Sequence, residues 1–464
     1  MHLRSPRGLA LLVSFLTLAL AGLKDGLAAG PPNLVVILAD DLGAECLSSY
    51  GSLDYQTPRL DALAASGVRF TNAFAQPLCT PSRVQIMTGK YNFRNYVEFG
   101  YLPPKEVTFG DLMKAAGYKT CVAGKWQLSG SGRQYPEKTD PADWGFDEHC
   151  LWQLNNRAPY GDRGSRYWGP YIEQNGEVLE PGNDAYGPDV VAEFLMSFIE
   201  RHKDQPFFAY YPMILTHGPY EPSPGSADRG KKNVKYFKDM VEHMDVIVGR
   251  IVDRIEALGL ADDTIVIFTG DNGTGREVRT NTTNGVVPGG KGTMTDAGMH
   301  VPFIVRWPGK IARGTVSDRL VDFTDVVPSL LAATGTEKTN GFKTDGVAFL
   351  DAHGLSEQER EWTYSWYEAR HGENGGRNNG IFARDHKYKL FSDDRFFDVS
   401  TRPLSGDGEP LANDDLSPEA KMSKAKLQAV IDQFAAEGAV LSEATTETPT
   451  PRPRNRRGRA NKPE

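Results

Sequence analysis

Acidic and amide side chains follow two apolar stretches of the sequence, where predicted strands end. Asp40 and Asp41 come directly after the β-rich run NLVVILA, and Asp271 and Asn272 lie just past the run TIVIF. In a parallel sheet, these four oxygen-bearing side chains would converge at one edge, where such sheets bind ligands. The set suits a hard divalent cation such as Ca²⁺ or Mg²⁺. An Asp-Asp pair alone is more often a turn or a helix cap, so the prediction depends on both pairs.

A cysteine precedes a predicted helix start in LCTPSRVQIMTG, residues 78–89. Pro81 suits the first turn of a helix, so Cys79 is expected at the helix N-terminus, where partial positive charge favours an anion. Arg83 adds a fixed positive charge one turn away. The alternative interpretation is a small buried thiol before a capped helix.

The elements that must position these residues alternate along the chain. The runs 33–39, 207–215 and 264–268 have the composition of strands buried on both faces, and 58–66, 107–116 and 234–258 have helical spacing. This alternation predicts an α/β fold with a large, mostly parallel sheet sandwiched by helices. From about Glu361 the pattern changes to short β-rich segments with a hairpin turn at Asp385-His386, followed by helical spacing over 417–438. It predicts a smaller C-terminal antiparallel sheet with a helix.

The termini and the composition indicate an exported protein. Two arginines, an apolar run and small residues predict a signal peptide over 1–29. The apolar run is too short for a membrane span, so we expect a secreted or periplasmic protein. We predict a catalytic domain over 31–355, a small α+β domain over 356–440 and a disordered basic tail over 441–464.

Charge and cysteine usage exclude some classes of function. The formal net charge of −8 over 464 residues is mild, which argues against nucleic acid as a partner. Zinc-site spacing and the density of a disulfide scaffold are both absent from the four cysteines, Cys46, Cys79, Cys121 and Cys150.

The segment Cys79-Thr80-Pro81-Ser82-Arg83, with Thr88-Gly89 after it, resembles the signature of type I sulfatases, the formylglycine-dependent branch of the alkaline phosphatase superfamily. The likeness covers most of the chain and includes Asp40-Asp41, Gly117-Tyr118-Lys119-Thr120, Gly124-Lys125-Trp126, Thr216-His217-Gly218-Pro219-Tyr220, Asp271-Asn272-Gly273 and Gly289-Gly290-Lys291-Gly292-Thr293.

This resemblance implies a modified nucleophile. In the family a formylglycine-generating enzyme reads Cys-x-Pro-x-Arg and oxidises the cysteine, here Cys79, to 3-oxoalanine (formylglycine). One hydroxyl of the hydrated aldehyde attacks sulfur, and the other, once deprotonated, expels sulfate as the carbonyl re-forms. The cation lowers the pKa of the attacking hydroxyl and neutralises sulfate oxygens.

The resemblance also implies roles for the other residues. Asp40, Asp41, Asp271 and Asn272 would hold the cation, Ca²⁺ or Mg²⁺, together with residue 79. Arg83 and Lys125 would stabilise the hydrate and bind the sulfate charge. His217 and Lys291 would face the bridging oxygen, and His217 is the better general-acid candidate because its pKa lies near working pH.

Two positions depart from the family pattern. The residue after Gly-Lys-Trp is Gln127 where the family usually has a histidine, the expected base for sulfate release. Glutamine cannot take a proton at neutral pH, so another base substitutes, a water chain relays the proton, or turnover is slow. The second departure, Asp296-Ala297-Gly298-Met299-His300 in place of Glu-Gly-Gly-x-Arg, is expected to alter loop anchoring more than chemistry.

Two stretches rich in aromatic residues and arginine, 91–101 and 152–171, could bind a sulfated glycan, or could simply pack domains together. Candidate substrate contacts are Arg94, Arg370 and His371. The sequence therefore predicts a sulfatase acting on a sulfated carbohydrate or another sulfate ester. The alternatives are a phosphodiesterase or phosphonate monoester hydrolase of the same superfamily, and a sulfated-glycan-binding protein with low turnover, suggested by Gln127.

Overall fold

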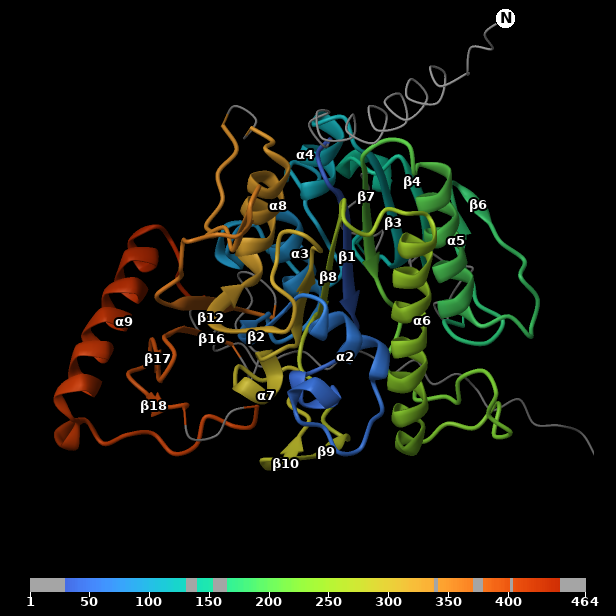
Figure 1. The fold of residues 1–464 in the computed structure, drawn as a ribbon. Coiled ribbons are helices and arrows are strands. Elements are labelled where there is room, and N and C mark those ends of the chain that lie inside the picture. Colours follow the sequence, from blue (N-terminus) through green and yellow to red (C-terminus); the bar gives the residue numbers. More distant parts are fainter. Residues whose placement is uncertain are drawn as a thin grey trace, which may run out of the picture.

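A ten-stranded sheet forms the centre of the molecule in the computed structural model, which describes residues 30–130, 140–152, 165–337, 341–369, 379–400 and 404–442 (Figure 1). Its strands lie in the order β12-β2-β11-β8-β1-β7-β3-β4-β5-β6. Their bounds are β1 Asn33–Ala39, β2 Val68–Phe74, β3 Lys119–Lys125, β4 Glu148–Trp152, β5 Glu173–Gln174, β6 Glu177–Val178, β7 Phe207–Pro212, β8 Thr264–Gly270, β11 Phe303–Arg306 and β12 Thr315–Asp322.

The centre of this sheet is parallel, as the sequence predicts. β1 pairs in parallel with both β7 and β8, and β3 pairs in parallel with β7 and β4. β11 is antiparallel to its neighbours β2 and β8, and the short β5 and β6 continue antiparallel at the edge. The predicted α/β class with a large, mostly parallel sheet is confirmed.

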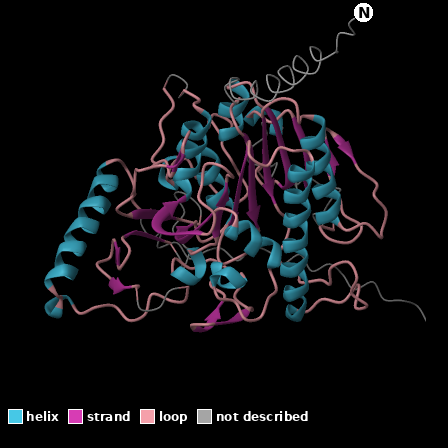
Figure 2. Ribbon diagram, in the orientation of Figure 1, coloured by secondary structure: helices cyan, strands magenta, loops and turns pink. Residues whose placement is uncertain are grey.

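Helices cover both faces of the sheet (Figure 2). The described α-helices are α2 Pro58–Ala65, α3 Cys79–Thr88, α4 Phe109–Ala115, α5 Gly187–Arg201, α6 Phe237–Ala257, α7 Asp296–Met299, α8 Val326–Thr334 and α9 Pro418–Ala436. Along β1, Leu34, Val36 and Leu38 join the buried cluster that contains α3, α4 and α8, while the alternate residues join the cluster under α2, α5 and α6. A strand buried on both faces needs apolar side chains in both directions, which explains the unbroken run NLVVILA.

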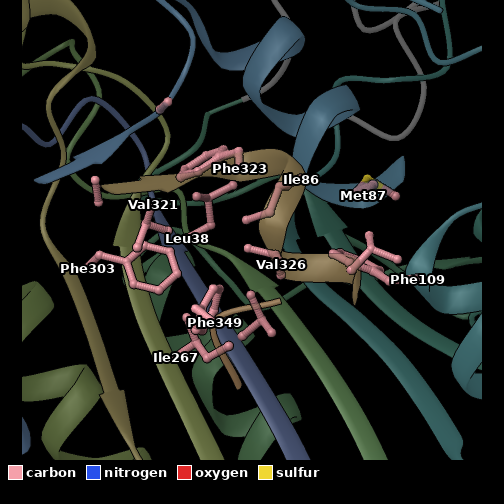
Figure 3. Close-up of a cluster of buried hydrophobic side chains, with 14 of the residues drawn as sticks. Leu38, Ile86, Met87, Phe109, Ile267, Phe303, Val321, Phe323, Val326 and Phe349 are labelled. Carbon is pink, nitrogen blue, oxygen red and sulfur yellow. The ribbon is translucent and has the colours of Figure 1, made fainter. Parts of the chain in front are cut away.

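The cluster on the α3 side is drawn in Figure 3, where Leu38 of β1 meets Ile86 of α3, Val326 of α8 and Phe303 of β11. The same cluster continues into the C-terminal region through Tyr364, Trp366, Leu427 and Phe434. The C-terminal sheet therefore packs on the core that lies beneath α3.

That C-terminal sheet has four antiparallel strands, β15 Thr363–Tyr367, β16 Gly380–Arg384, β17 Tyr388–Phe391 and β18 Phe396–Asp398. The predicted turn at Asp385-His386 joins β16 to β17, and α9 packs on both strands. The predicted small antiparallel sheet with a helix is confirmed. Two further two-stranded ribbons are β9 Arg279–Thr282 with β10 Gly285–Pro288, and β13 Leu350–Asp351 with β14 Gly354–Leu355.

Two elements, β7 and α6, have bounds that differ from the prediction. The strand predicted over 207–215 ends at Pro212, because the next residues leave the ladder and bind the end of β1: Asp40 N donates to Leu215 O at 2.8 Å and Thr216 N donates to Asp40 O at 2.7 Å. The helix predicted from residue 234 begins with a 3₁₀ turn at Val234–Tyr236 before α6.

The termini and cysteines complete the comparison with the prediction. The predicted signal peptide lies outside the described residues, as does the predicted tail apart from 441 and 442. Among the described helices, none combines the length and apolar character that crossing a bilayer requires. All four cysteines are buried and free. The domain boundary between 355 and 356 stays a prediction.

Candidate active site

The ends of β1 and β8 bring four polar side chains together. Ala39 and Gly270 are partners in the parallel ladder, so the residues that follow them emerge side by side. Asp41 N donates to Asp271 Oδ1 at 3.0 Å, and Asn272 Nδ2 donates to Asp41 Oδ1 at 2.9 Å. All four side chains, including that of Asp40, are buried. The structure thus places the four residues at one sheet edge.

Cys79 lies at the first position of α3, the place that Pro81 predicts. Its Sγ and one potential ligand atom each of Asp40, Asp41 and His217 all lie within 4.8 Å of one another. The whole of α3 is buried, so its N-terminus is held against the end of β1. The sulfur of Cys79 therefore lies within the carboxylate cluster and not in a purely apolar environment.

Two buried, positively charged side chains, Lys125 and Arg83, contact these carboxylates. Lys125, the last residue of β3, donates through Nζ to both carboxylate oxygens of Asp40 at 2.9 and 2.8 Å. Arg83 of α3 donates to Asp271 Oδ2 at 3.3 to 3.4 Å and to Lys125 O at 2.5 Å. Both positive charges are thus carried by residues of regular secondary structure.

His217 and Lys291 approach Asp41 from two loops. His217 Nε2 lies 3.6 Å from Asp41 Oδ2, and Lys291 Nζ lies 2.6 Å from the same oxygen. Lys291 N donates to Thr274 O at 2.9 Å, which ties its loop to the segment after β8. Gly290 is needed there because a Cβ would lie 2.4 Å from the backbone carbon of Ala297. Both predicted residues thus reach the site.

Burial and charge set the pKa values of the acidic groups. Burial acts to raise the pKa of Asp40, but Lys125, His217, Arg83 and Lys291 outweigh it and hold that pKa below its ordinary value. Burial, followed by the negative charge of Asp40, raises the pKa of Asp271 to about 7. A divalent cation between these carboxylates would relieve their repulsion and favour both charged forms.

The thiol of Cys79 is not activated as it stands. Burial raises its pKa to about 12, although Lys125 acts in the opposite direction. A thiol with this pKa is almost wholly protonated near neutral pH and is a weak nucleophile, because the thiolate is the reactive form. Direct attack by an unmodified Cys79 is therefore disfavoured.

The residues fit a hard cation. Asp40, Asp41 and Asp271 supply carboxylate oxygens, which such ions prefer. Asn272 Oδ1 is buried and accepts no hydrogen bond within the described part of the chain, although its Nδ2 is used twice. A buried acceptor without a partner is costly, and a cation would satisfy it. When bound, the cation would act as a Lewis acid.

The remaining predicted site residues are Gln127, Arg94, Arg370 and His371. Gln127 has a left-handed backbone, with φ of 54°, and its buried Oε1 also lacks a hydrogen-bond partner among the described residues. Arg94 pairs with Asp345 at 2.8 Å and with Glu437 of the segment after α9 at 2.5 Å, so its guanidinium serves contacts within the fold. Arg370 and His371 lie outside the described residues.

Sequence reasoning missed the residues that support the site. Glu45, which is buried, accepts from Thr274 Oγ1 at 2.5 Å, and Thr274 Oγ1 accepts from Gly43 N at 3.0 Å, so the loops after β1 and β8 are tied together. Asp296, the first residue of the segment 296–300 that differs from the family pattern, pairs with Arg384 of β16 at 2.6 Å. The available signal was slight for each: Glu45 is a carboxylate soon after the apolar run of β1, and Asp296 stands in a segment that departs from the family pattern.

Comparison with known proteins gives a consistent family. A family model described as sulfatase matches residues 32–336, and one described as N-sulphoglucosamine sulphohydrolase, C-terminal, matches residues 290–405. N-acetylgalactosamine-6-sulfatase of Canis lupus familiaris is 32% identical over 364 residues, covering 73% of this chain and 69% of the relative. Arylsulfatase A of Homo sapiens is 34% identical over 419 residues, covering 80% and 76%.

Solved structures share the fold. A 6S-sulfatase described with the metabolism of multiple glycosaminoglycans by Bacteroides thetaiotaomicron has a TM-score of 0.71 at 23% identity, covering 88% of this chain and all of that one. BT4656, solved with its substrate D-glucosamine-2-N,6-O-disulfate, has a TM-score of 0.69 at 20% identity, covering 88% and 99%. A phosphonate monoester hydrolase from Silicibacter pomeroyi has a TM-score of 0.63 at 21% identity, covering 88% and 95%.

Proposed function

This chain belongs to the sulfatase family and hydrolyses sulfate esters, and from that premise we propose that it is an exported, cation-dependent enzyme acting on a sulfated carbohydrate through formylglycine at position 79. The observation that carries the proposal is the convergence of Cys79, Asp40, Asp41 and His217 at the ends of parallel strands. No other cluster of this composition is present among the described residues.

The high pKa of the unmodified thiol supports a modified residue 79. A protonated, buried cysteine has no obvious use as a nucleophile beside three carboxylates. A hydrated aldehyde at that position would supply two hydroxyls within reach of the same charged groups. The Cys-x-Pro-x-Arg segment that the modifying enzyme would read begins at the start of α3, and it is buried in the fold, so modification would precede folding.

The side chains of the site would have different roles in sulfate-ester cleavage. Asp40, Asp41, Asp271 and Asn272 would hold Ca²⁺ or Mg²⁺ with residue 79. Lys125 and Arg83 keep positive charge beside the nucleophile, which stabilises the developing negative charge. Lys291 and His217 meet on Asp41 Oδ2, at the accessible side of the cluster, where the leaving group would lie. These last two would contact its bridging oxygen.

A carbohydrate substrate is supported by the segment 91–101. It lines a cavity of about 780 Å³ together with residues 103–106. After burial, Tyr367, Glu98 and Cys79 all act to raise the pKa of Tyr96, which places this ring within electrostatic reach of residue 79. The Tyr96 ring is itself buried, but Phe93, which lines the same cavity, is partly exposed, and the apolar face of a sugar packs on such rings.

Peptide mass spectrometry of the segment around residue 79, on protein from its native host, tests the nucleophile. We expect a loss of about 18 Da relative to the cysteine-containing peptide, because oxygen replaces sulfur and the oxidised carbon loses two hydrogens. An unmodified thiol throughout would leave the proposed mechanism without its nucleophile. Loss of activity on chelation, restored by Ca²⁺ or Mg²⁺, tests the cation.

A phosphodiesterase or phosphonate monoester hydrolase is the second candidate, because a hydrolase of that kind shares the fold. Parallel assays with an aryl sulfate and an aryl phosphodiester separate the two. The third candidate, a binding protein of low turnover, follows from Gln127, whose amide cannot act as a base. A burst of one product per site followed by a stalled enzyme would favour it.

A further inference from the structure

Three consecutive residues, Arg166, Tyr167 and Trp168, bind the loop that carries His217. Arg166 Nη1 lies 2.8 Å from His217 Nδ1. The Tyr167 hydroxyl donates to the backbone oxygen of His217 and lies 3.4 Å from that of Ile214. Trp168 Nε1 donates to Pro222 O at 3.0 Å. The ring, the backbone and the far end of the loop are therefore each held by one of the three.

This holding segment is itself fixed by other parts of the fold. The guanidinium of Arg166 lies 4.2 Å from the ring centroid of Trp152, the buried last residue of β4. The Tyr167 ring is buried and stacks on Tyr186 at 5.9 Å. A guanidinium stacked on an indole loses little further freedom when it forms a hydrogen bond, because its planar donors already point in set directions. Arg166 is thus prepositioned for His217.

The contact with Arg166 decides which ring nitrogen of His217 carries the proton. A guanidinium has donors only, so Nδ1 must present its lone pair to it, and the neutral ring then carries its proton on Nε2. Nδ1 also lies 2.5 Å from Gly218 O, which would favour the opposite tautomer. The arginine contact is the more informative of the two, because Gly218 is the next residue and chain connectivity alone keeps its carbonyl near the ring.

We propose that Arg166 is a positioning residue for His217: it fixes the tautomer and the direction of the neutral ring, so that Nε2–H donates a hydrogen bond to the bridging oxygen of the sulfate ester. His217 then stabilises the leaving oxygen as a hydrogen-bond donor and does not transfer a proton as the general acid that the sequence suggests. Nε2 is the nitrogen on the side of Asp41, at 3.6 Å from Oδ2. Tyr167 and Trp168 fix the backbone of the loop through their hydrogen bonds to His217 O and Pro222 O, and so keep the ring in place. The inference rests on the proposed function, in which His217 faces the leaving group.

A series of aryl sulfates with leaving groups of increasing pKa tests the proposal in the variant Arg166→Met. As the S–O bond breaks, charge develops on the bridging oxygen, and a misdirected donor matters most for poor leaving groups. We expect kcat/KM to fall about tenfold to a hundredfold for the poorest leaving groups and much less for 4-nitrophenyl sulfate. An equal loss across the series would overturn the proposal, because general loosening affects all substrates alike.

Two matched variants sharpen the test. Arg395 also stacks on an aromatic ring, that of Phe391 in β17, at 4.4 Å, and it pairs with Asp393 rather than with His217, so Arg395→Met should leave the series unchanged. In a His217→Ala background, Arg166→Met should cost nothing further, since two residues that act as a unit are not additive. Additive losses would contradict the proposal. Arg166→Lys should recover only part of the loss, because lysine lacks the planar fork.

A spectroscopic measurement separates failure of this inference from failure of the proposed function. In protein with ¹⁵N-labelled histidine, the His217 resonance, assigned by its loss in His217→Ala, should show an unprotonated Nδ1 in the wild type and a mixture of tautomers in Arg166→Met. An Nδ1-protonated wild type would overturn the inference whatever the activity. A wild type with the expected tautomer that hydrolyses no sulfate ester would instead count against the proposed function alone.

Discussion

The active site is built from two regions that are positioned in different ways. Asp40, Asp41, Asp271 and Asn272 directly follow adjacent parallel strands, and the ladder between β1 and β8 places them. His217 and Lys291 lie on loops: the His217 ring contacts the distant Arg166, and the segment that follows Lys291 is anchored by the ion pair between Asp296 and the distant Arg384. The first region depends on backbone hydrogen bonds of the sheet, whereas the second depends on particular side chains.

The difference shows where the protein can change. A strand end cannot move without disturbing the core on both faces of the sheet, so the carboxylates are effectively part of the scaffold. A loop can move when one supporting side chain changes. Differences in substrate preference are therefore expected to arise mainly at the loops of His217 and Lys291.

The largest effect is expected at the strand ends. Asp271→Asn removes a carboxylate that accepts from Asp41 N and from Arg83, and it should lower kcat/KM on the order of 10³-fold or more with loss of bound cation, because the ion supplies several kcal/mol of transition-state stabilisation. Activity assays and metal analysis check this. Asp263→Asn, just before the start of the same strand, is the matched control and should change neither; a bound cation in Asp271→Asn would contradict the comparison.

The second effect concerns the support of the Lys291 loop. Arg384 and Asp296 are both buried and form an ion pair at 2.6 Å, so Arg384→Met should lower the free energy of unfolding by about 3 to 5 kcal/mol because it leaves a buried charge unpaired. Urea unfolding measures this. Arg254→Met breaks the exposed pair with Glu200 and should cost less than about 1 kcal/mol. Similar losses in both variants would mean that the loop needs no buried support.

The third effect concerns the charge of Lys291 itself, as distinct from the contacts that hold its loop. Lys291→Met should lower kcat/KM by about 10² to 10³-fold, because it removes a positive charge at the developing negative charge, while the cation stays bound. The exposed Lys310→Met serves as the control for losing one lysine. If Lys291→Met also lost its cation, the two regions would not be separable.

The smallest effect is a dependence of stability on pH. Burial raises the pKa of Glu45 to about 7 from an ordinary value of 4.5, so the folded state binds more protons than the unfolded state between these pH values. The contribution of Glu45 to the free energy of unfolding should therefore fall by up to about 3 kcal/mol as pH rises from about 4.5 to about 7, and then level off.

The variant Glu45→Gln should lose this dependence, since an amide does not titrate and can still accept from Thr274. Its stability relative to the wild type should therefore increase with pH across the same window. Parallel pH profiles for the two proteins, measured by thermal unfolding, would show that burial of Glu45 does not link the loops after β1 and β8 to protonation.

Local signals in the sequence predicted the first region well. Apolar runs predicted β1 and β8, and the four polar residues after them converge as expected. Pro81 predicted the helix start at Cys79. The supports of the second region were not predictable in this way: Arg166 was one of several arginines in an aromatic stretch, and Asp296 was only a departure from a family pattern.

The sequence by itself determined the α/β class, the strands β1, β7 and β8 and the residues that follow β1 and β8, because hydrophobic period and turn chemistry act over a few neighbouring residues. Only the tertiary structure decided which side chains hold His217 and the segment that follows Lys291: Arg166 contacts His217, and Arg384 pairs with Asp296. Arg166 and His217 are 51 residues apart, and Arg384 and Asp296 are 88 apart. Contacts over such separations form only when the whole core has packed, and no local pattern encodes them.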